Sequence, residues 1–216
     1  MSADLNYSIK RLVRGLTSDN HAVKQGHFLA TATVLSRFRK SIDVMKLLKL
    51  ITEETKTSKS MKQPEVHANT IGRLMCLSAI VDAQLYQQSA TQLNHEVWNK
   101  LCNDLLVLWK ENDYLHESVQ QVLVKMLSRV VPTANGMKLL ERIASELIGS
   151  DYRAWAFQHA DKMSMFLAIR KIYNQRYQQG GKLKGAEVYE YQPFKDTLSV
   201  KKIGKLLGVT SYLLPR

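Results

Sequence analysis

Apolar side chains recur along this chain with the period of an α-helix, in one segment after another. The first stripe consists of Leu5, Ile9, Leu12, Val13 and Leu16, and charged residues fall beside it. Apolar residues at this spacing line one face of a helix with 3.6 residues per turn. No segment shows a strand-like alternation of comparable strength. The sequence therefore predicts an all-α fold.

Capping residues and prolines divide this pattern into helices. Ser41 and Asn94 are candidate N-caps, Pro64 suits a first helical turn, and Pro132 stops a helix. The polar stretches 52–63 and 84–93 predict loops, and Asn112 with Asp113 breaks the pattern again. We expect helices over about 5–16, 21–39, 42–51, 64–83, 95–111, 115–130, 137–148 and 151–177.

Consecutive helices with short connections pack as antiparallel pairs, and a row of such pairs is an α-solenoid of the armadillo or HEAT kind. No strict repeat of residue identity is present, so a closed helical bundle also fits this pattern. We expect a helical repeat domain over 1–177 and a basic, glycine-containing linker over 178–198. A short helix capped by Ser199 follows within 199–216 and is expected to continue into a next repeat.

The positive charge of the chain lies at its two ends. The 216 residues carry 31 Lys and Arg against 19 Asp and Glu, a net charge of +12. Residues 1–60 hold 11 basic and 5 acidic side chains, residues 61–160 hold 9 and 10, and residues 161–216 hold 11 and 4. This distribution favours an anionic partner, which is nucleic acid, an acidic protein segment or a membrane surface. A solvated basic face without a partner is the alternative.

The composition excludes several classes of protein. A hydrophobic share of 45% excludes a mostly disordered chain. The longest apolar stretch, Leu74–Val81, is far shorter than the roughly 18 residues of a membrane span. The first residues show no secretory signal. The two cysteines, Cys76 and Cys102, are too few for a disulfide framework and predict a reducing compartment.

No catalytic or metal-binding motif stands out. Gly180-Gly181-Lys182 has the residue types of a phosphate loop but lacks its spacing, its preceding strand and its hydroxyl, and therefore favours a linker. The six histidines are scattered without metal-ligand spacing. Trp98 and Trp109 share one side of one helix, where core packing explains them better than base stacking. We therefore predict a non-enzymatic chain with no cofactor, metal or small-molecule substrate.

Three basic clusters are the candidate nucleic-acid contacts. One lies on the first helix, one closes the second helix, and one spans the glycine-containing loop and the last helix. Contacts of such residues with phosphates give affinity without sequence choice. For the second cluster, stabilisation of a helix C-terminus by cations is the alternative explanation. In chain order the clusters are Lys10, Arg11 and Arg14; Arg37, Arg39 and Lys40; and Lys182, Lys184, Lys201, Lys202 and Lys205.

Several short motifs occur in a characteristic order. They are Ile-Lys-Arg-Leu-Val-Arg-Gly-Leu-Thr-Ser at 9–18, followed by Gly26, Leu29-Ala30 and Val34-Leu35; a basic loop at 56–61; Gly72-Arg73-Leu74; Lys-Glu-Asn-Asp-Tyr-Leu-His-Glu at 110–117; and Thr197-Leu198-Ser199. Together they resemble the DNA polymerase V / Myb-binding protein family over about 5–208. The chain departs from the family pattern at His27, Tyr114 and His116, where the family has an aromatic residue, a tryptophan and an arginine.

The resemblance implies a nucleolar, armadillo-like repeat protein that acts in ribosomal RNA production and ribosome biogenesis. Animal members of the family also bind transcription factors. The aspartate motifs of a polymerase, such as Asp-Thr-Asp-Ser, are absent from this sequence. Because family members are much longer, we expect this chain to be the N-terminal portion of such a protein.

The sequence thus predicts a non-enzymatic scaffold of the nucleus and nucleolus, without a membrane association. Its expected partners are ribosomal RNA or rDNA chromatin, together with other nucleolar proteins or transcription factors. The alternative is a purely protein-binding solenoid, a transcription regulator or an assembly or cargo adaptor, whose basic surface meets acidic partners. Arg73 of the Gly-Arg-Leu motif either contacts a partner or bonds to carbonyl groups of a neighbouring helix.

Overall fold

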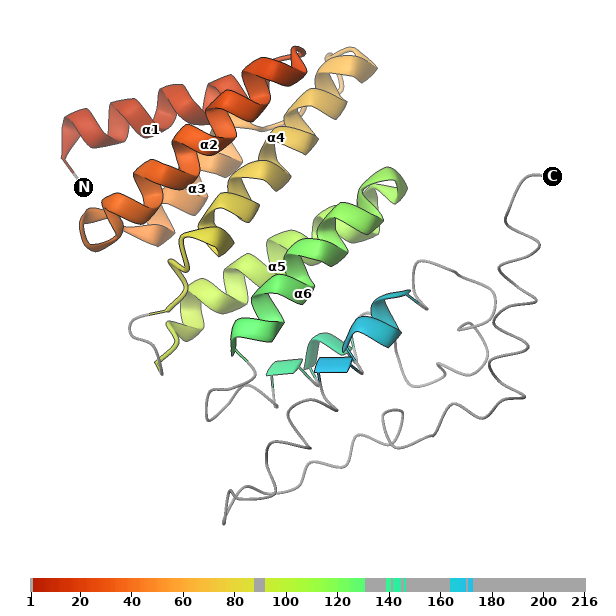
Figure 1. Cartoon of the computed structure of the whole chain (residues 1–216). Helices are drawn as coiled ribbons and strands as arrows, with labels where there is room; N and C mark the ends of the chain where they lie inside the picture. Colours follow the sequence, from red (N-terminus) through yellow and green to blue (C-terminus); the bar gives the residue numbers. More distant parts are fainter. Residues whose placement is uncertain are drawn as a thin grey trace. The chain divides into compact units, whose positions relative to one another are not determined.

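A computed structural model of the protein is all-α, as the sequence predicts (Figure 1). It describes residues 2–87 and 92–130 and, further along, residues 139–140, 142–144, 146, 164–169 and 171–172. Among these residues the only β-type pairing is a single antiparallel bridge between Gln87 and Leu93. The chain divides into two compact units, residues 1–123 and 124–216.

The regular elements follow one another with short connections. In chain order they are α1 (Ala3–Leu16), α2 (His21–Arg37), the 3₁₀ helix η1 (Arg39–Ser41), α3 (Val44–Glu54), α4 (Gln63–Asp82), α5 (His95–Glu111), the 3₁₀ helix η2 (Asp113–Leu115) and α6 (His116–Val130).

Side-chain caps set several helix starts. Asn94 accepts a hydrogen bond from Val97 at the start of α5, as expected, and Asn20 accepts hydrogen bonds from the backbone N–H groups of Ala22 and Val23 at the start of α2. The prediction that Ser41 caps the third helix is wrong. Ser41 belongs to η1, and an extended residue follows it, so Asp43 caps α3 by accepting from the Lys46 N–H.

Two predicted helix ends also differ from the structure. The second helix ends at Arg37 rather than at 39, because the chain tightens there into η1. The loop expected from Thr52 begins only at Thr55. The hydroxyl groups of Thr52 and Thr55 donate to the carbonyls of Leu48 and Ile51, and these bonds continue the last turn of α3.

Pro64 lies in the first turn of α4, as predicted. Proline suits this position because its missing N–H would have no helical partner. The backbone N–H of Lys62 donates to Glu65 Oε2 at 3.1 Å, which adds one half of a capping box.

The first unit is a layered array of helices that alternate in direction (Figure 1). Helix α1 packs against α2, α3 and α4, and α5 packs against α3 and α4. This arrangement confirms a helical-repeat fold. Its core consists of Trp98 from α5 and of buried apolar side chains from α1, α2, α3 and α4. Burying one such side chain contributes about 2 kcal/mol to the stability of the fold.

The second unit is described only in part. Helical residues lie within both the 137–148 and the 151–177 segments, and Arg142 pairs with Glu146 one turn on, at 3.3 Å. The predicted linker over 178–198 and the helix within 199–216 lie outside the described residues, so both stay predictions.

Candidate nucleic-acid interface

Two of the three cations in the first basic cluster are paired with a carboxylate of the same chain. Lys10 Nζ lies 3.0 Å from Glu54 Oε1, and Arg14 Nε donates to Glu54 Oε2. Glu54 is the last residue of α3, where the helix dipole disfavours a carboxylate. The two cations on α1 offset this cost, so they join the first helix to the third.

The ion cluster changes the acidity of the carboxyl group. The hydrogen bond from Arg14, aided by Lys10, lowers the pKa of Glu54 below its usual 4.5, although partial burial acts in the opposite direction. Glu54 is therefore ionised at neutral pH and neutralises part of the charge that the first cluster would otherwise offer to a phosphate.

The second cluster also divides into internal and exposed cations. Arg39 donates through Nη2 to the backbone carbonyl of Gln87, so it ties η1 to the turn after α4. Arg37 ends α2, and Lys40 lies in η1. Both side chains are exposed, and within the described part of the chain neither makes a hydrogen bond or an ion pair.

Of the six cations in these two clusters, three thus remain available to a partner. Arg11, like Arg37 and Lys40, is exposed and makes no polar contact with any described residue. Arg11 lies on α1, beside Arg14. The candidates of the C-terminal cluster, Lys182, Lys184, Lys201, Lys202 and Lys205, all lie outside the described residues and stay predictions.

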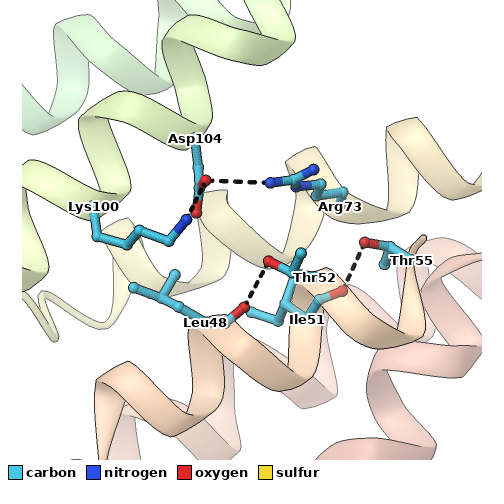
Figure 2. Close-up of polar contacts among 7 residues, drawn as sticks. All are labelled: Leu48, Ile51, Thr52, Thr55, Arg73, Lys100 and Asp104. Atoms are coloured by element: carbon cyan, nitrogen blue, oxygen red, sulfur yellow. Dashed lines mark hydrogen bonds and ion pairs between the residues drawn. The ribbon is translucent and has the colours of Figure 1, made fainter. Parts of the chain in front are cut away.

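A second ion cluster joins α4 to α5 (Figure 2). Asp104 Oδ1 accepts from Arg73 Nη2 at 3.2 Å and from Lys100 Nζ at 2.9 Å. The cluster lies beside the last turns of α3, where Thr52 and Thr55 bond to the backbone. Only 5% of Asp104 is exposed, so the carboxylate depends on its two partners.

This cluster gives Arg73 a structural role. Its partner within the fold is a carboxylate of the next helix and not a backbone carbonyl. The buried Nε of Arg73 has no hydrogen-bond partner among the described residues. Arg73 therefore acts within the fold. Sequence reasoning missed Asp104, although an acid four residues after Lys100 in an apolar helix face is a usable signal.

The two motif glycines permit close helix contacts. A Cβ atom on Gly72 would lie 2.8 Å from the backbone oxygen of Leu16, so only glycine lets α4 approach the end of α1 this closely. A Cβ atom on Gly15 would overlap the ring of His27 at 2.3 Å. His27, one of the departures from the family pattern, therefore packs directly on the glycine of the preceding motif.

The other two departures contact neighbouring rings. The Tyr114 ring lies 4.7 Å from that of His67 in α4. The His116 ring stacks on Trp109 at 4.4 Å with an interplanar angle of 16°, and its Nε2 lies 2.8 Å from the Trp109 carbonyl oxygen. The 110–117 motif therefore fixes the turn between α5 and α6.

The remaining candidate residues have roles in packing. Trp98 and Trp109 are buried, as predicted, and so are the free thiols Cys76 and Cys102. Burial raises the pKa of Cys76 to about 12, so its thiol is not a nucleophile at neutral pH. In the described stretches no three His, Cys, Asp or Glu side chains converge as metal ligands, and no helix there is long and apolar enough to cross a membrane.

Comparison with known protein families identifies a match over most of the chain. The family model described as DNA polymerase phi covers residues 7–197, which is most of the chain. This family is related to the DNA polymerase V / Myb-binding protein family that the motifs resemble. No curated protein and no solved structure matches the chain.

Proposed function

The chain belongs to the DNA polymerase phi family, and on this basis we propose that it is a non-enzymatic scaffold of the nucleolus that binds ribosomal RNA or rDNA chromatin together with protein partners. The family is a nucleolar one that is involved in ribosome biogenesis. In this function the chain holds nucleic acid and protein components together and also takes part in transcription regulation.

The observation that carries the nucleic-acid part is the set of exposed, unpaired cations in the first unit. Arg11, Arg37 and Lys40 lie on or next to the neighbouring helices α1 and α2. Contacts of these side chains with phosphates would release counterions and give salt-dependent binding without base recognition. The lysines of the C-terminal cluster would add to the same electrostatic attraction.

The test is binding of the full chain to pre-ribosomal RNA and to an unrelated RNA, over about 50 to 200 mM salt. We expect a steep fall of affinity with salt. Replacing Arg11, Arg37 and Lys40 by Gln should weaken binding and reduce the slope of log K against log [salt] by up to about 3, since each lost phosphate contact removes about one unit.

The matched control removes the same charge elsewhere. Gln at Lys46, Lys49 and Lys110, three exposed lysines outside the proposed surface, should leave the slope closer to that of the parent chain. A second variant with Gln at Lys182, Lys184, Lys201, Lys202 and Lys205 tests the C-terminal cluster separately. If the variant at Arg11, Arg37 and Lys40 or the variant of the C-terminal cluster binds RNA as the parent chain does, the cations replaced in it are not part of the interface. If the parent chain does not bind RNA even at low salt, the nucleic-acid proposal is wrong.

The alternative function is that of a purely protein-binding solenoid, and the exposed apolar side chains Tyr7, Leu29 and Phe38 favour it. Mass spectrometry after a nuclease-treated pull-down distinguishes the two, because protein partners that are bridged by nucleic acid are lost. The absence of enzymatic activity is also a proposal. Magnesium-dependent nucleotide incorporation that a carboxylate substitution abolishes would overturn it.

A further inference from the structure

We propose that the open groove between α1 and α2 is a docking site for an acidic amphipathic helix of a partner protein. This inference specifies the protein-binding part of the proposed scaffold function and rests on it. Four features of the first unit carry it: the shape of the groove, the apolar side chains along it, the charges on its rim, and the exposed outer face of α2.

The groove follows the line along which α1 and α2 meet. One hollow is lined by Tyr7, Leu12 and Gly15 of α1 and by His27 of α2. The next is lined by Leu5 of α1 and by Val34 and Phe38 at the other end of α2, and both hollows share Ser8. From Leu5 to Gly15 the groove runs for about 15 Å, or roughly three turns of a bound helix.

Apolar side chains are exposed where a ligand would touch them. Tyr7 on α1 is 66% exposed, and Phe38, the residue that follows α2, is 43% exposed. Leu12 in the first hollow, and Leu5 and Val34 in the second, add further apolar contacts along the groove. Regularly spaced contacts of this kind match the i, i+3/i+4 and i+7 anchors of an amphipathic helix.

Helix α2 is apolar on more than one side. Leu35 is buried against the interior, whereas Val23 and Leu29 are exposed, Leu29 to 68%. A Cβ atom added to Gly26, next to this exposed face, would meet nothing within 4 Å. Helices that are apolar around much of their circumference are normally covered on both sides. In the first unit, α1 and α4 pack against α2 and leave this outer face open.

The charges on the rim select an acidic ligand. Arg11 and Lys40 line the groove, and Asp4 is the single acid among the described residues of its lining. Arg14, which also lines the groove, is neutralised by Glu54. A helix with Asp or Glu beside its apolar stripe would therefore place its carboxylates near unpaired cations.

The same charges disfavour two other occupants. A second copy of the chain, bound by two-fold symmetry through this groove, would place Arg11 and Lys40 near their own equivalents. Residues 161–216 of this chain hold 11 basic and 4 acidic side chains, so they do not complement the groove either. An acidic helix of a different protein satisfies both the apolar contacts and the charge.

The experiment measures binding of a fluorescein-labelled synthetic peptide to the full chain by fluorescence anisotropy. The peptide has 15 residues, with Leu at helical i, i+3/i+4 and i+7 positions and Glu on the flanks. A scrambled peptide of the same composition and a peptide with Lys in place of Glu are the controls. We expect the acidic amphipathic peptide to bind about tenfold or more tightly than either control.

Paired variants locate the site. Tyr7→Ser with Phe38→Ser should weaken peptide binding about tenfold, because these substitutions remove two exposed anchors and little core. Val107→Ser with Tyr114→Ser removes exposed apolar side chains that do not line the groove and should leave the affinity unchanged. Arg11→Glu with Lys40→Glu should reverse the preference, so that the Lys peptide binds more tightly than the Glu peptide.

A photo-crosslinking peptide tests the site without any variant. With benzoylphenylalanine at one Leu position, the crosslinks to the unaltered chain should map to α1 and α2. The proposed docking site would be contradicted by any of three results: crosslinks outside α1 and α2, equally tight binding of the scrambled peptide, or undiminished peptide binding by the Tyr7→Ser/Phe38→Ser variant.

RNA binding of the same variants separates this inference from the scaffold function. Tyr7→Ser/Phe38→Ser should leave RNA affinity unchanged, since neither side chain is charged. RNA binding without peptide binding would contradict the proposed docking site and support the nucleic-acid function. Peptide binding without RNA binding would support the docking site and contradict the nucleic-acid function. Displacement of the bound peptide by RNA, with the serine variant weakening both ligands equally, would assign the groove to nucleic acid and overturn the inference.

Discussion

The first unit contains two clusters in which two cations share one carboxylate, and the two clusters differ in their surroundings. At the surface, Lys10 and Arg14 of α1 bind Glu54 at the end of α3. In the interior, Arg73 of α4 and Lys100 of α5 bind Asp104. The chemical groups are similar, but the exposure of the partners is not, and exposure decides what each cluster contributes.

Water competes for the surface cluster. The side chains of Lys10 and Arg14 are 40% and 56% exposed, so solvent screens their attraction to Glu54. Less water reaches the pair of Arg73 and Asp104, whose side chains are only 22% and 7% exposed, although Lys100, at 43%, is about as exposed as Lys10. The desolvation of an interior cluster is costly, so loss of one partner leaves an uncompensated charge. The surface cluster adjusts the stability, whereas the interior cluster specifies how α4 and α5 meet.

The largest effect is expected at Asp104. Asp104→Asn leaves Arg73 partly buried without its counter-charge and should lower the free energy of unfolding by about 3 kcal/mol. Urea denaturation followed by circular dichroism measures this change. The double variant Asp104→Leu/Arg73→Met replaces the ion pair by apolar groups and should recover most of the loss. An Asp104→Asn effect below that of the surface variant would contradict the comparison.

Next in size is the packing contact beside Arg73. Gly72→Ala places a Cβ atom 2.8 Å from the Leu16 oxygen, so α4 must move away from α1. We expect a loss of about 2 kcal/mol in the free energy of unfolding.

The matched control for this variant is Gly26→Ala. Its added methyl group meets no atom within 4 Å in an exposed helix, so the substitution should raise stability by about 0.5 kcal/mol. Equal effects of the two alanine variants in chemical denaturation would show that α4 does not depend on its close contact with α1.

Glu54 has a smaller effect and a distinct pH dependence. Glu54→Gln should cost about 1 kcal/mol at pH 7, because it removes the carboxylate that binds Lys10 and Arg14. The pKa of Glu54 is lower in the folded chain than its usual 4.5. Its contribution is therefore complete above pH 4.5 and disappears as the pH falls through the lowered value. Stability curves from pH 7 to pH 3 should converge for the parent chain and Glu54→Gln at the acidic end. Parallel curves would contradict the ion pair.

The sequence predicted the helices better than it predicted the contacts between them. Periodicity and caps located α1 to α6, because both are local properties of the chain. The end of α3 was placed too early because the stretch 52–63 has almost no large apolar residues, yet the hydroxyls of Thr52 and Thr55 bond back to the helix. Ser41 was predicted as the cap of the third helix, because nothing local marks the 3₁₀ helix η1.

The candidate site was predictable only in part. Residue type identified Lys10, Arg11 and Arg14 as one basic cluster, but the spacing along α1 does not show which of them reach Glu54 on another helix. The internal role of Arg39 depends on Gln87, 48 residues away. Pairing with residues far along the chain depends on the tertiary structure. The sequence alone therefore does not show which cations are paired within the fold and which are available to a partner.

The smallest expected effect concerns a pair that is exposed on both sides. Lys49 and Glu53 lie one helical turn apart on α3 at 4.0 Å, with side chains 79% and 62% exposed. Lys49→Gln should change the free energy of unfolding by no more than about 0.3 kcal/mol, because solvent and salt screen both charges. Chemical denaturation at low and at high salt measures this baseline. The Glu54 effect should exceed it at low salt, because Glu54 holds two cations and its side chain is only 13% exposed. If Lys49→Gln proves as costly as Glu54→Gln, exposure does not rank the ion pairs of this chain, and the distinction between the surface and interior clusters fails.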